Sequence, residues 1–255
     1  QRPLDYVELT RETFSGYLLK QGGTFLGTTN KASTINSVDH NGKSIGQTQM
    51  IIEGYRQLNL DGLIIIGGDG SMQILQNLAK KGNLNIVAIP KTIDNDVGAT
   101  ESSIGFDTAV QVATQALDNL HSTAVSHSRS MILEVMGRDA GHIALSSGIA
   151  GGADIILLPE IKYSFKGIVN KLNEMKEINL KHSLIVVAEA VKKEDGEKVI
   201  HEYKDGQKRL GGIGDYIANE IMSKTDIECR VTALGHVQRG APPTHNDRIL
   251  ASAFG

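Results

Sequence analysis

The segment "LIIIGGDGSMQI", residues 63–74, places a carboxylate among glycines. Leu63 to Ile66 predict a buried strand, and the apolar spacing after them predicts a helix that stops at Gly82. Asp69 is then on a strand-to-helix turn, where small residues and helix amides favour an anion. A bound cation would explain an aspartate there, so the turn predicts a magnesium–phosphate ligand, with Asp69 reaching the metal directly or through water. The alternative is a tight turn with an aspartate N-cap.

A carboxylate pair follows the next expected strand, in "IPKTIDNDVGAT", residues 89–100. Asp94 and Asp96 are two residues apart, and on extended backbone such side chains point to opposite sides. Beside a metal-bound polyphosphate, Asp94 suits the base that accepts the proton of an attacking hydroxyl, and Asp96 suits the metal. Alone, this stretch would be interpreted as a loop of Asx-turns. Its place one strand after the glycine-rich turn favours the catalytic interpretation.

Cations gather in the second half of the chain. Arg129 and Arg138 flank the expected strand in "SHSRSMILEVMGRDAGHIAL", and Arg230, His236 and Arg239 follow in "CRVTALGHVQRGAPPTHNDRILAS". Arginine at a strand end with small neighbours can bind a phosphate or offset charge on a transferred phosphoryl group. Any one of them alone is typical of a weak surface ion pair. Carboxylates in the first half and cations in the second predict a metal–nucleotide site that faces a phosphorylated substrate.

The elements that must position these residues alternate along the chain. Strands are expected at 24–29, 62–68, 85–90, 130–137, 154–160, 183–190 and 229–236, and amphipathic helices include 45–60, 165–179 and 214–224. This alternation predicts parallel α/β sheets with crossover helices. Two separate sets of glycine-rich strand ends predict two similar lobes that face a shared cleft. The polar stretch 191–208 is expected to be an exposed hairpin or loop.

Composition narrows the function classes. The chain has 255 residues, 40% hydrophobic and 22% charged, as in soluble globular proteins. A net charge of -3 gives no electrostatic footprint for nucleic acid or an anionic membrane. No apolar stretch has transmembrane length. Cys229 is the single cysteine, which excludes an internal disulfide and fits a reducing compartment, so a cytoplasmic protein is expected. Because the chain opens on Gln1 and stops inside an apparent helix, it is expected to be the middle of a longer protein.

Seven motifs resemble those of the 6-phosphofructokinases in order and spacing. They are "GGDGS", "PKTIDND", "GFDTA", "EVMGRDAGHIAL", "AGGAD…LLPE", "VVAEA" and "RVTALGHVQRG", spread over residues 62–255. The resemblance implies two Rossmann-like lobes: a phosphoryl-donor lobe at 1–105, a fructose 6-phosphate lobe at 106–237, and a return segment at 238–255. It implies a glycolytic transferase that phosphorylates the 1-hydroxyl of fructose 6-phosphate.

The resemblance also implies roles for single residues. Asp69 and Asp96 would help hold Mg2+, Asp94 would be the base, Arg138 would stabilise the transferring phosphoryl group, and Thr92 would contact the sugar or the phosphate. The donor would contact Gly67, Gly68, Asp69, Gly70, Ser71 and Lys91. Fructose 6-phosphate would contact Thr92, Asp94, Met136, Gly137, Arg138, Glu189, His236 and Arg239. Arg129 and Arg230 would reach the sugar pocket of a neighbouring subunit, which implies a homo-oligomer, a tetramer or a dimer.

The match to the family is incomplete. The family's first strand, its glycine-rich donor loop and the last part of its sugar lobe do not occur in this sequence, so the fold is expected to be incomplete at both ends. His121 stands where a basic contact to an allosteric effector is common, which leaves allosteric control open.

The donor is predicted from two positions that disagree. Gly70 leaves room for an α-phosphate and nucleoside where pyrophosphate-dependent relatives usually carry an aspartate. Lys91 is typical of pyrophosphate enzymes, although glycine with lysine also resembles ATP-using plant and cyanobacterial-type members. An anionic side chain would obstruct the nucleotide directly, whereas a lysine fits either donor. The prediction is therefore ATP, with pyrophosphate as the alternative.

Two other classes are compatible with part of the sequence. NAD or lipid kinases share the "GGDG" turn, but "MGRDAGHIAL" and "GHVQRG" have no role in them. A non-catalytic paralogue would be expected to lose an acid or a cation. Asp69, Asp94, Asp96 and Arg138 are all present, so an active enzyme is favoured.

Overall fold

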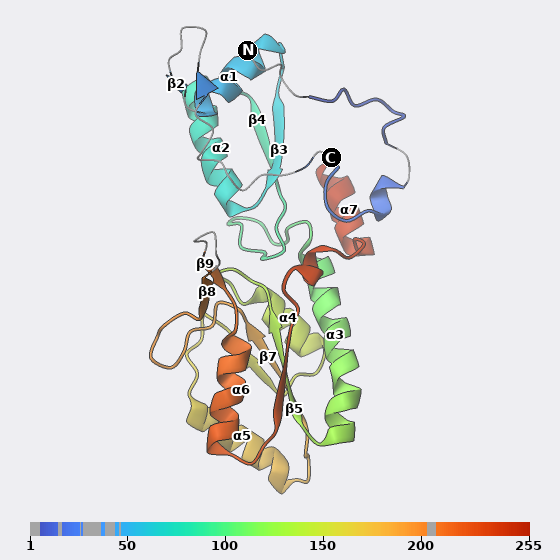
Figure 1. The fold of residues 1–255 in the computed structure, drawn as a ribbon. Coiled ribbons are helices and arrows are strands. Elements are labelled where there is room, and N and C mark those ends of the chain that lie inside the picture. The colour runs from blue at the N-terminus through green and yellow to red at the C-terminus, as the bar shows by residue number, and fades with distance from the viewer. Residues whose placement is uncertain are drawn as a thin grey trace.

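The computed structural model describes residues 6–14, 17–25, 27, 37–38, 44–45, 47–202 and 208–255. They form two lobes, and the C-terminal end of the chain returns from the second lobe toward the first (Figure 1). The helices are η1 (Leu18–Lys20), α1 (Gln47–Gln57), α2 (Asp69–Gly82), α3 (Phe106–His127), α4 (His142–Ala150), α5 (Phe165–Glu177), α6 (Ile213–Lys224), η2 (Gly235–Arg239) and α7 (His245–Phe254). The strands are β1 (Ser37–Val38), β2 (Ser44–Ile45), β3 (Leu63–Gly67), β4 (Ile86–Pro90), β5 (Ser130–Val135), β6 (Ile155–Leu157), β7 (Ser183–Ala188), β8 (Ile200–Glu202), β9 (Lys208–Leu210) and β10 (Cys229–Ala233).

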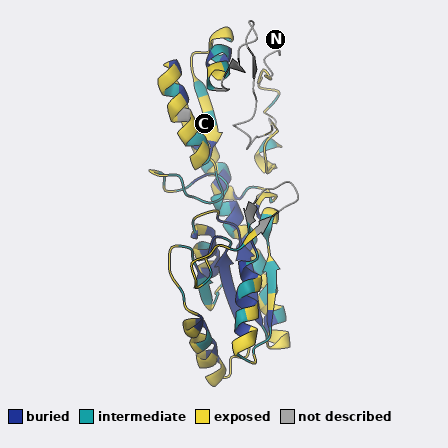
Figure 2. Cartoon of the chain, turned by 60° about the vertical axis from the view of Figure 1, so that its left-hand side comes forward, coloured by how far each residue is buried: buried dark blue, intermediate teal, exposed yellow. Residues whose placement is uncertain are grey.

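The second lobe contains the main core. Its sheet has the order β10-β5-β7-β6, and all its strands are parallel. Every residue of β5 and β7 is buried, as expected for central parallel strands covered on both faces (Figure 2). Helix α3 packs with α4, and α5 packs with α6. Because these strands are parallel, the carboxyl ends of β5, β7 and β10 lie at one edge of the sheet.

The first lobe is smaller. Strands β3 and β4 pair in parallel, with Gly67 opposite Pro90, so their carboxyl ends meet. Helices α1 and α2 meet, and Ile52 and Leu78 from them form a small core with Ile65 of β3. Helix α2 ends at Gly82 as predicted, and Asn83 after it supplies the left-handed residue that closes the helix, with φ 48°.

The predicted burial of Leu63 to Ile66 is wrong. The strand forms, but Ile64 is 63% exposed and Ile66 56% exposed. Alternate side chains point to opposite faces, and among the described residues only the α1–α2 face is covered. A β-branched run therefore predicted the strand correctly but not the number of its faces that are covered.

Two further expectations concern segments at the edges of the lobes. In 24–29, Thr24, Phe25 and Gly27 are not in a strand, and the other residues lie outside the described ones. The polar stretch 191–208 contains β8, which pairs with β9 in antiparallel fashion, so the predicted hairpin is confirmed. No helix in the described ranges is long and apolar enough to span a membrane.

Candidate active site

The turn after β3 is shaped by glycines. Gly68 is the N-cap of α2 with extended backbone, and Asp69 is the first helical residue, so the aspartate N-cap alternative is wrong. A Cβ on Gly67 would lie 2.5 Å from the hydroxyl oxygen of Ser71, which leaves no room for a side chain. At Gly70 a Cβ would meet nothing within 4 Å. The turn is thus tight on its inner side and open at Gly70.

The loop after β4 lies against this turn. The Lys91 amide donates to the Gly67 carbonyl over 2.8 Å. A Cβ on Gly68 would lie 3.2 Å from the Cβ of Thr92. The "GGDGS" and "PKTIDND" motifs, predicted to act together, are therefore in contact.

The loop 91–105 is held by side chains within it. Asn95 has left-handed backbone with φ 52°, and its Oδ1 accepts from the Ser103 amide at 2.8 Å. The Ser103 hydroxyl donates to the Thr92 carbonyl at 2.7 Å, and the Asn95 Nδ2 donates to the Glu101 carbonyl at 3.3 Å. The expected extended backbone between Asp94 and Asp96 is wrong here, because asparagine tolerates the left-handed conformation and its amide fixes the turn.

Opposing charges meet at Asp94. Burial raises the pKa of its carboxyl group and the Asp96 charge raises it further, whereas the Arg239 charge, a backbone hydrogen bond from Arg138 and the Arg138 charge lower it. The Asp94 amide donates to Thr92 Oγ1 over 3.2 Å. Asp94 thus lies within electrostatic reach of Arg138, which follows β5, and of Arg239, at the end of η2.

The end of β5 supplies the opposite side. Gly137 has φ 141°, and a Cβ on it would lie 2.4 Å from the Ala140 carbonyl oxygen, so the turn requires glycine. Buried Gln238 accepts from the Met136 amide over 2.7 Å and so fastens η2, which carries His236, to this turn. The Gln238 Nε2 is buried without a partner in the described structure. The Arg138 side chain is 76% exposed and lies 3.7 Å from the Asp139 carboxylate.

Glu189, just after β7, joins the same group. Burial raises its pKa to about 7, and the charges of Asp94 and Glu134 raise it as well. A backbone hydrogen bond from Gly137 and the Arg239 charge act in the opposite direction. Residues from the ends of three strands of the second lobe therefore converge near Asp94.

Arg129 and Arg230 lie elsewhere. Arg129 directly precedes β5, and Arg230 is the second residue of β10. Roughly 20 Å of strand therefore separates Arg129 from Met136, which follows the far end of β5. Both arginines pair with Glu228, Arg129 at 2.7 Å. The structure brings these two together but places them away from the other predicted substrate residues of this chain.

The carboxylates permit a magnesium ion that is shared with phosphates. Asp96 Oδ1 is buried without a hydrogen-bond partner, and the Asp69 carboxylate accepts from Gln73 Nε2 at 3.0 Å. No cluster of three or more histidine, cysteine, aspartate or glutamate side chains suited to a metal occurs in the described residues. Mg2+ commonly binds one or two carboxylates plus water and substrate phosphates, so Asp69 and Asp96 fit it.

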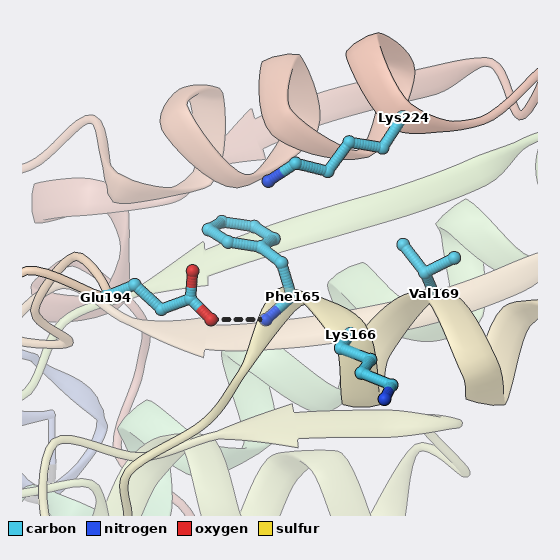
Figure 3. Close-up of a pocket in the computed structure, with 5 residues that line it drawn as sticks. All are labelled: Phe165, Lys166, Val169, Glu194 and Lys224. Carbon is cyan, nitrogen blue, oxygen red and sulfur yellow. Dashed lines mark hydrogen bonds between the residues drawn. The ribbon is translucent and has the colours of Figure 1, made fainter.

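A separate hollow of about 370 Å3 lies between α5 and α6 (Figure 3). Two of its charged side chains have partners: Glu194 accepts from the Phe165 amide at 2.9 Å, and Lys224 pairs with Glu220. None of its lining residues belongs to the predicted site.

The matches with known proteins agree with this geometry. The family model described as phosphofructokinase matches residues 2–255. This chain belongs to the phosphofructokinase family. It is 54% identical over 255 residues to "ATP-dependent 6-phosphofructokinase 1" of Synechocystis sp., covering 100% of this chain and 70% of that protein. It is 56% identical over 238 residues to the protein of the same name from Nostoc sp., covering 93% of this chain and 66% of that protein.

A solved structure supports the same family. Pichia pastoris phosphofructokinase in the T-state matches with a TM-score of 0.77 and 27% identity, over 96% of this chain and 26% of that one. The family, the enzyme class and the fold class predicted from the sequence are confirmed. The chain spans about two thirds of the length of the two curated relatives.

Three residues with side-chain hydrogen bonds near the candidate site were not predicted as site residues: Asn95, Gln238 and Asp247. Asn95 lay inside a recognised motif, and its tolerance of left-handed backbone was an available signal. Gln238 also lay inside one, but nothing in the sequence distinguishes a buried amide from an exposed one. Asp247 lies in "THND", a threonine-to-acid spacing that signals a helix start but not a distant partner.

Proposed function

We propose that the protein containing this chain is an ATP-dependent 6-phosphofructokinase, which transfers the γ-phosphoryl group of ATP to the 1-hydroxyl of fructose 6-phosphate. The observation that carries this proposal is the environment of Asp94, whose half-buried carboxyl group feels the charges of Asp96, Arg239 and Arg138. A base near cations supplied by other segments of the chain is the arrangement that phosphoryl transfer to a hydroxyl needs.

Asp94 would accept the proton of the 1-hydroxyl as its oxygen attacks. Its raised pKa suits this task, because a base works best when its pKa lies nearer the working pH. Thr92, which accepts from the Asp94 amide, would orient the loop against sugar or phosphate. Bound Mg2+, held by Asp69 and Asp96, would offset the charge of the donor phosphates.

Arg138 would offset charge on the transferring phosphoryl group. Its side chain is largely exposed and its partner Asp139 is 3.7 Å away, so it is free to turn toward a ligand. Arg239, His236 and Glu189 would bind fructose 6-phosphate together with the backbone of Met136 and Gly137. The donor lobe would then comprise residues 1–105, the sugar lobe 106–237 and the return segment 238–255.

ATP is the donor that the turn favours. The open space at Gly70 leaves room for phosphates and a nucleoside beyond the glycine cradle of Gly67, Gly68 and Ser71. Relatives that span this chain at 54% and 56% identity are named ATP-dependent. Pyrophosphate is the second candidate, because Lys91 is exposed beside Gly67, where it could neutralise a phosphate.

A homo-oligomer is part of the proposal. The paired Arg129 and Arg230, at the end of the sheet remote from Asp94, would serve the sugar site of a neighbouring subunit. Cytoplasmic location follows from the glycolytic substrates.

The test is a donor panel on the full-length protein, with fructose 1,6-bisphosphate as the measured product. Formation with ATP and Mg2+ at a kcat/KM at least about tenfold above that with pyrophosphate is expected. A preference for pyrophosphate would show that the protein is the pyrophosphate-dependent enzyme, the second candidate. No product with either donor would overturn the proposed activity.

A further inference from the structure

Asp247, on the first turn of α7, is a buried carboxylate with three donors. It is 2% exposed. Its Oδ1 accepts from the Gly105 amide at 2.8 Å, and its Oδ2 accepts from the Thr108 amide at 3.0 Å and from the Thr108 hydroxyl. Gly105 and Thr108 begin α3, so a carboxylate from one helix caps the start of another.

Asp247 is itself held in place. Thr244 is the N-cap of α7, and its hydroxyl accepts from the Asp247 amide at 3.2 Å. The Thr244 amide donates to the Thr108 hydroxyl at 3.2 Å. The first turns of α3 and α7 are thus joined by reciprocal bonds, and α7 lies beside the junction of the lobes (Figure 1).

Gly105 links this joint to the loop with the two aspartates. It is the residue that ends the loop, and its φ of 103° is a conformation that suits glycine. One residue earlier, the Ile104 amide donates to the Pro90 carbonyl at 3.0 Å, which closes the loop at its neck. Ser103 then ties the inside of the loop to Asn95 and Thr92.

We propose that Asp247 is a positioning residue that fixes Asp94 and Asp96 through Gly105 and the closed loop 91–105. The proposal deepens the phosphotransferase function proposed above and rests on it for its kinetic consequence. Without the Asp247 carboxylate, the amide donors of half-buried Gly105 and buried Thr108 lose their acceptors, and the neck of the loop gains freedom. A loosened loop would leave the ligands able to bind but the base poorly aligned for attack.

The test uses Asp247→Asn in the full-length protein. An asparagine keeps one oxygen acceptor and puts an NH2 group against the remaining donors, so the anchor is broken with little change in volume. We expect kcat to fall by about 10- to 100-fold, as misplacement of a reacting group produces, while KM for fructose 6-phosphate changes by less than about threefold. Amide hydrogen exchange in 92–105 should rise.

Asp107→Asn is the matched control. Asp107 bonds to the Thr244 hydroxyl at 2.5 Å and lies near Asn246, at the same joint, but its carboxylate makes no bond to Gly105 among the described contacts. It should lower the melting temperature yet keep kcat and loop exchange within about twofold of wild type. Equal losses of kcat in both variants, or wild-type kcat and exchange in Asp247→Asn, would overturn the proposal.

If Asp247→Asn fails to fold, amide hydrogen exchange of the wild-type protein tests the proposal instead. Amides of 92–105 and of the first turn of α7 should open together, with the same dependence on denaturant. Opening of α7 with the loop still protected would contradict the anchor. Hydrogen exchange requires no turnover, so it tests the anchoring role of Asp247 even if the wild-type protein is inactive. Inactivity of the wild-type protein would overturn only the proposed function.

Discussion

Asp94 carries the sharpest residue-scale prediction. Asp94→Asn in the full-length protein should lower kcat by several orders of magnitude while fructose 6-phosphate binding stays nearly intact, because a base acts mainly in the transition state. Steady-state kinetics and binding measured by calorimetry check this. Asp118→Asn, the same change on an exposed carboxylate of α3, should keep wild-type kinetics. A loss of kcat below about tenfold in Asp94→Asn would show that another group is the base.

We expect Gly70 to determine which phosphoryl donor fits. A Cβ there meets nothing within 4 Å, so Gly70→Asp should fold normally and act through its charge. We expect the kcat/KM ratio of ATP to pyrophosphate to fall by about tenfold or more, because a carboxylate would repel the α-phosphate. Asn77→Asp adds the same charge farther along α2 and should leave the ratio unchanged. A ratio unaltered by Gly70→Asp would mean that Gly70 does not face the donor.

We expect the stability of the folded protein to depend on pH through Glu189. Burial raises its pKa from 4.5 to about 7, so the folded protein binds this proton more tightly than the unfolded chain does. Its contribution is therefore fully present below about pH 4.5 and is lost as the pH rises to 7. Over this pH range the melting temperature of Glu189→Gln should rise relative to that of wild type. The expected rise is about 2–4 °C for each kcal/mol of stability that the wild-type protein loses.

Thermal unfolding at a series of pH values measures this difference. Glu174→Gln, on the exposed side of α5, should parallel the wild-type curve. A constant difference between Glu189→Gln and wild type would show that Glu189 titrates normally.

At the scale of elements, the loop 91–105 depends on Asn95. Both variants lose the hydrogen bonds to Ser103 and Glu101. Asn95→Gly keeps easy access to the left-handed backbone, whereas Asn95→Ala loses that access as well. Asn95→Ala should therefore be less stable than Asn95→Gly by about 1 kcal/mol. Urea unfolding measures the gap, and equal stability would mean that backbone strain contributes nothing here.

The elements themselves were largely predictable. Short apolar runs predicted β3, β4, β5, β7 and β10 correctly, because such a run is a local property of the sequence. The exposure of Ile64 was not, since it depends on which element covers the second face. The Asp247 anchor was not predictable either: "THND" signals a helix start, but its partner Gly105 is 142 residues away. The predicted site residues came from motifs that are local in sequence, whereas the bond between Asp247 and Gly105 joins residues distant in sequence.

At the scale of the whole molecule, the paired arginines predict shared sites. If Arg230 serves a neighbouring subunit, full-length Asp94→Asn and Arg230→Ala proteins should each be nearly inactive. Mixed oligomers, formed by unfolding and refolding the two together, should regain a measurable fraction of activity, because some sites combine an intact Asp94 with an intact Arg230. Asp94→Asn mixed with Asp96→Asn should not recover, because each site takes both aspartates from one subunit and therefore always lacks one of them. Absence of recovery in the first mixture would place Arg230 in its own subunit's site.

The bond between Gly105 and Asp247 also has a consequence in time. The residues of the loop leave the ribosome 142 positions before its anchor does. At about 5–20 residues per second, roughly 7–30 s of synthesis separate the two. During that interval the growing chain holds Asp94 and Asp96 with the start of α3 uncapped by its carboxylate. The nascent protein thus completes the frame of its reaction centre only near the end of this stretch of translation, and a chain arrested before position 247 carries both aspartates without that frame.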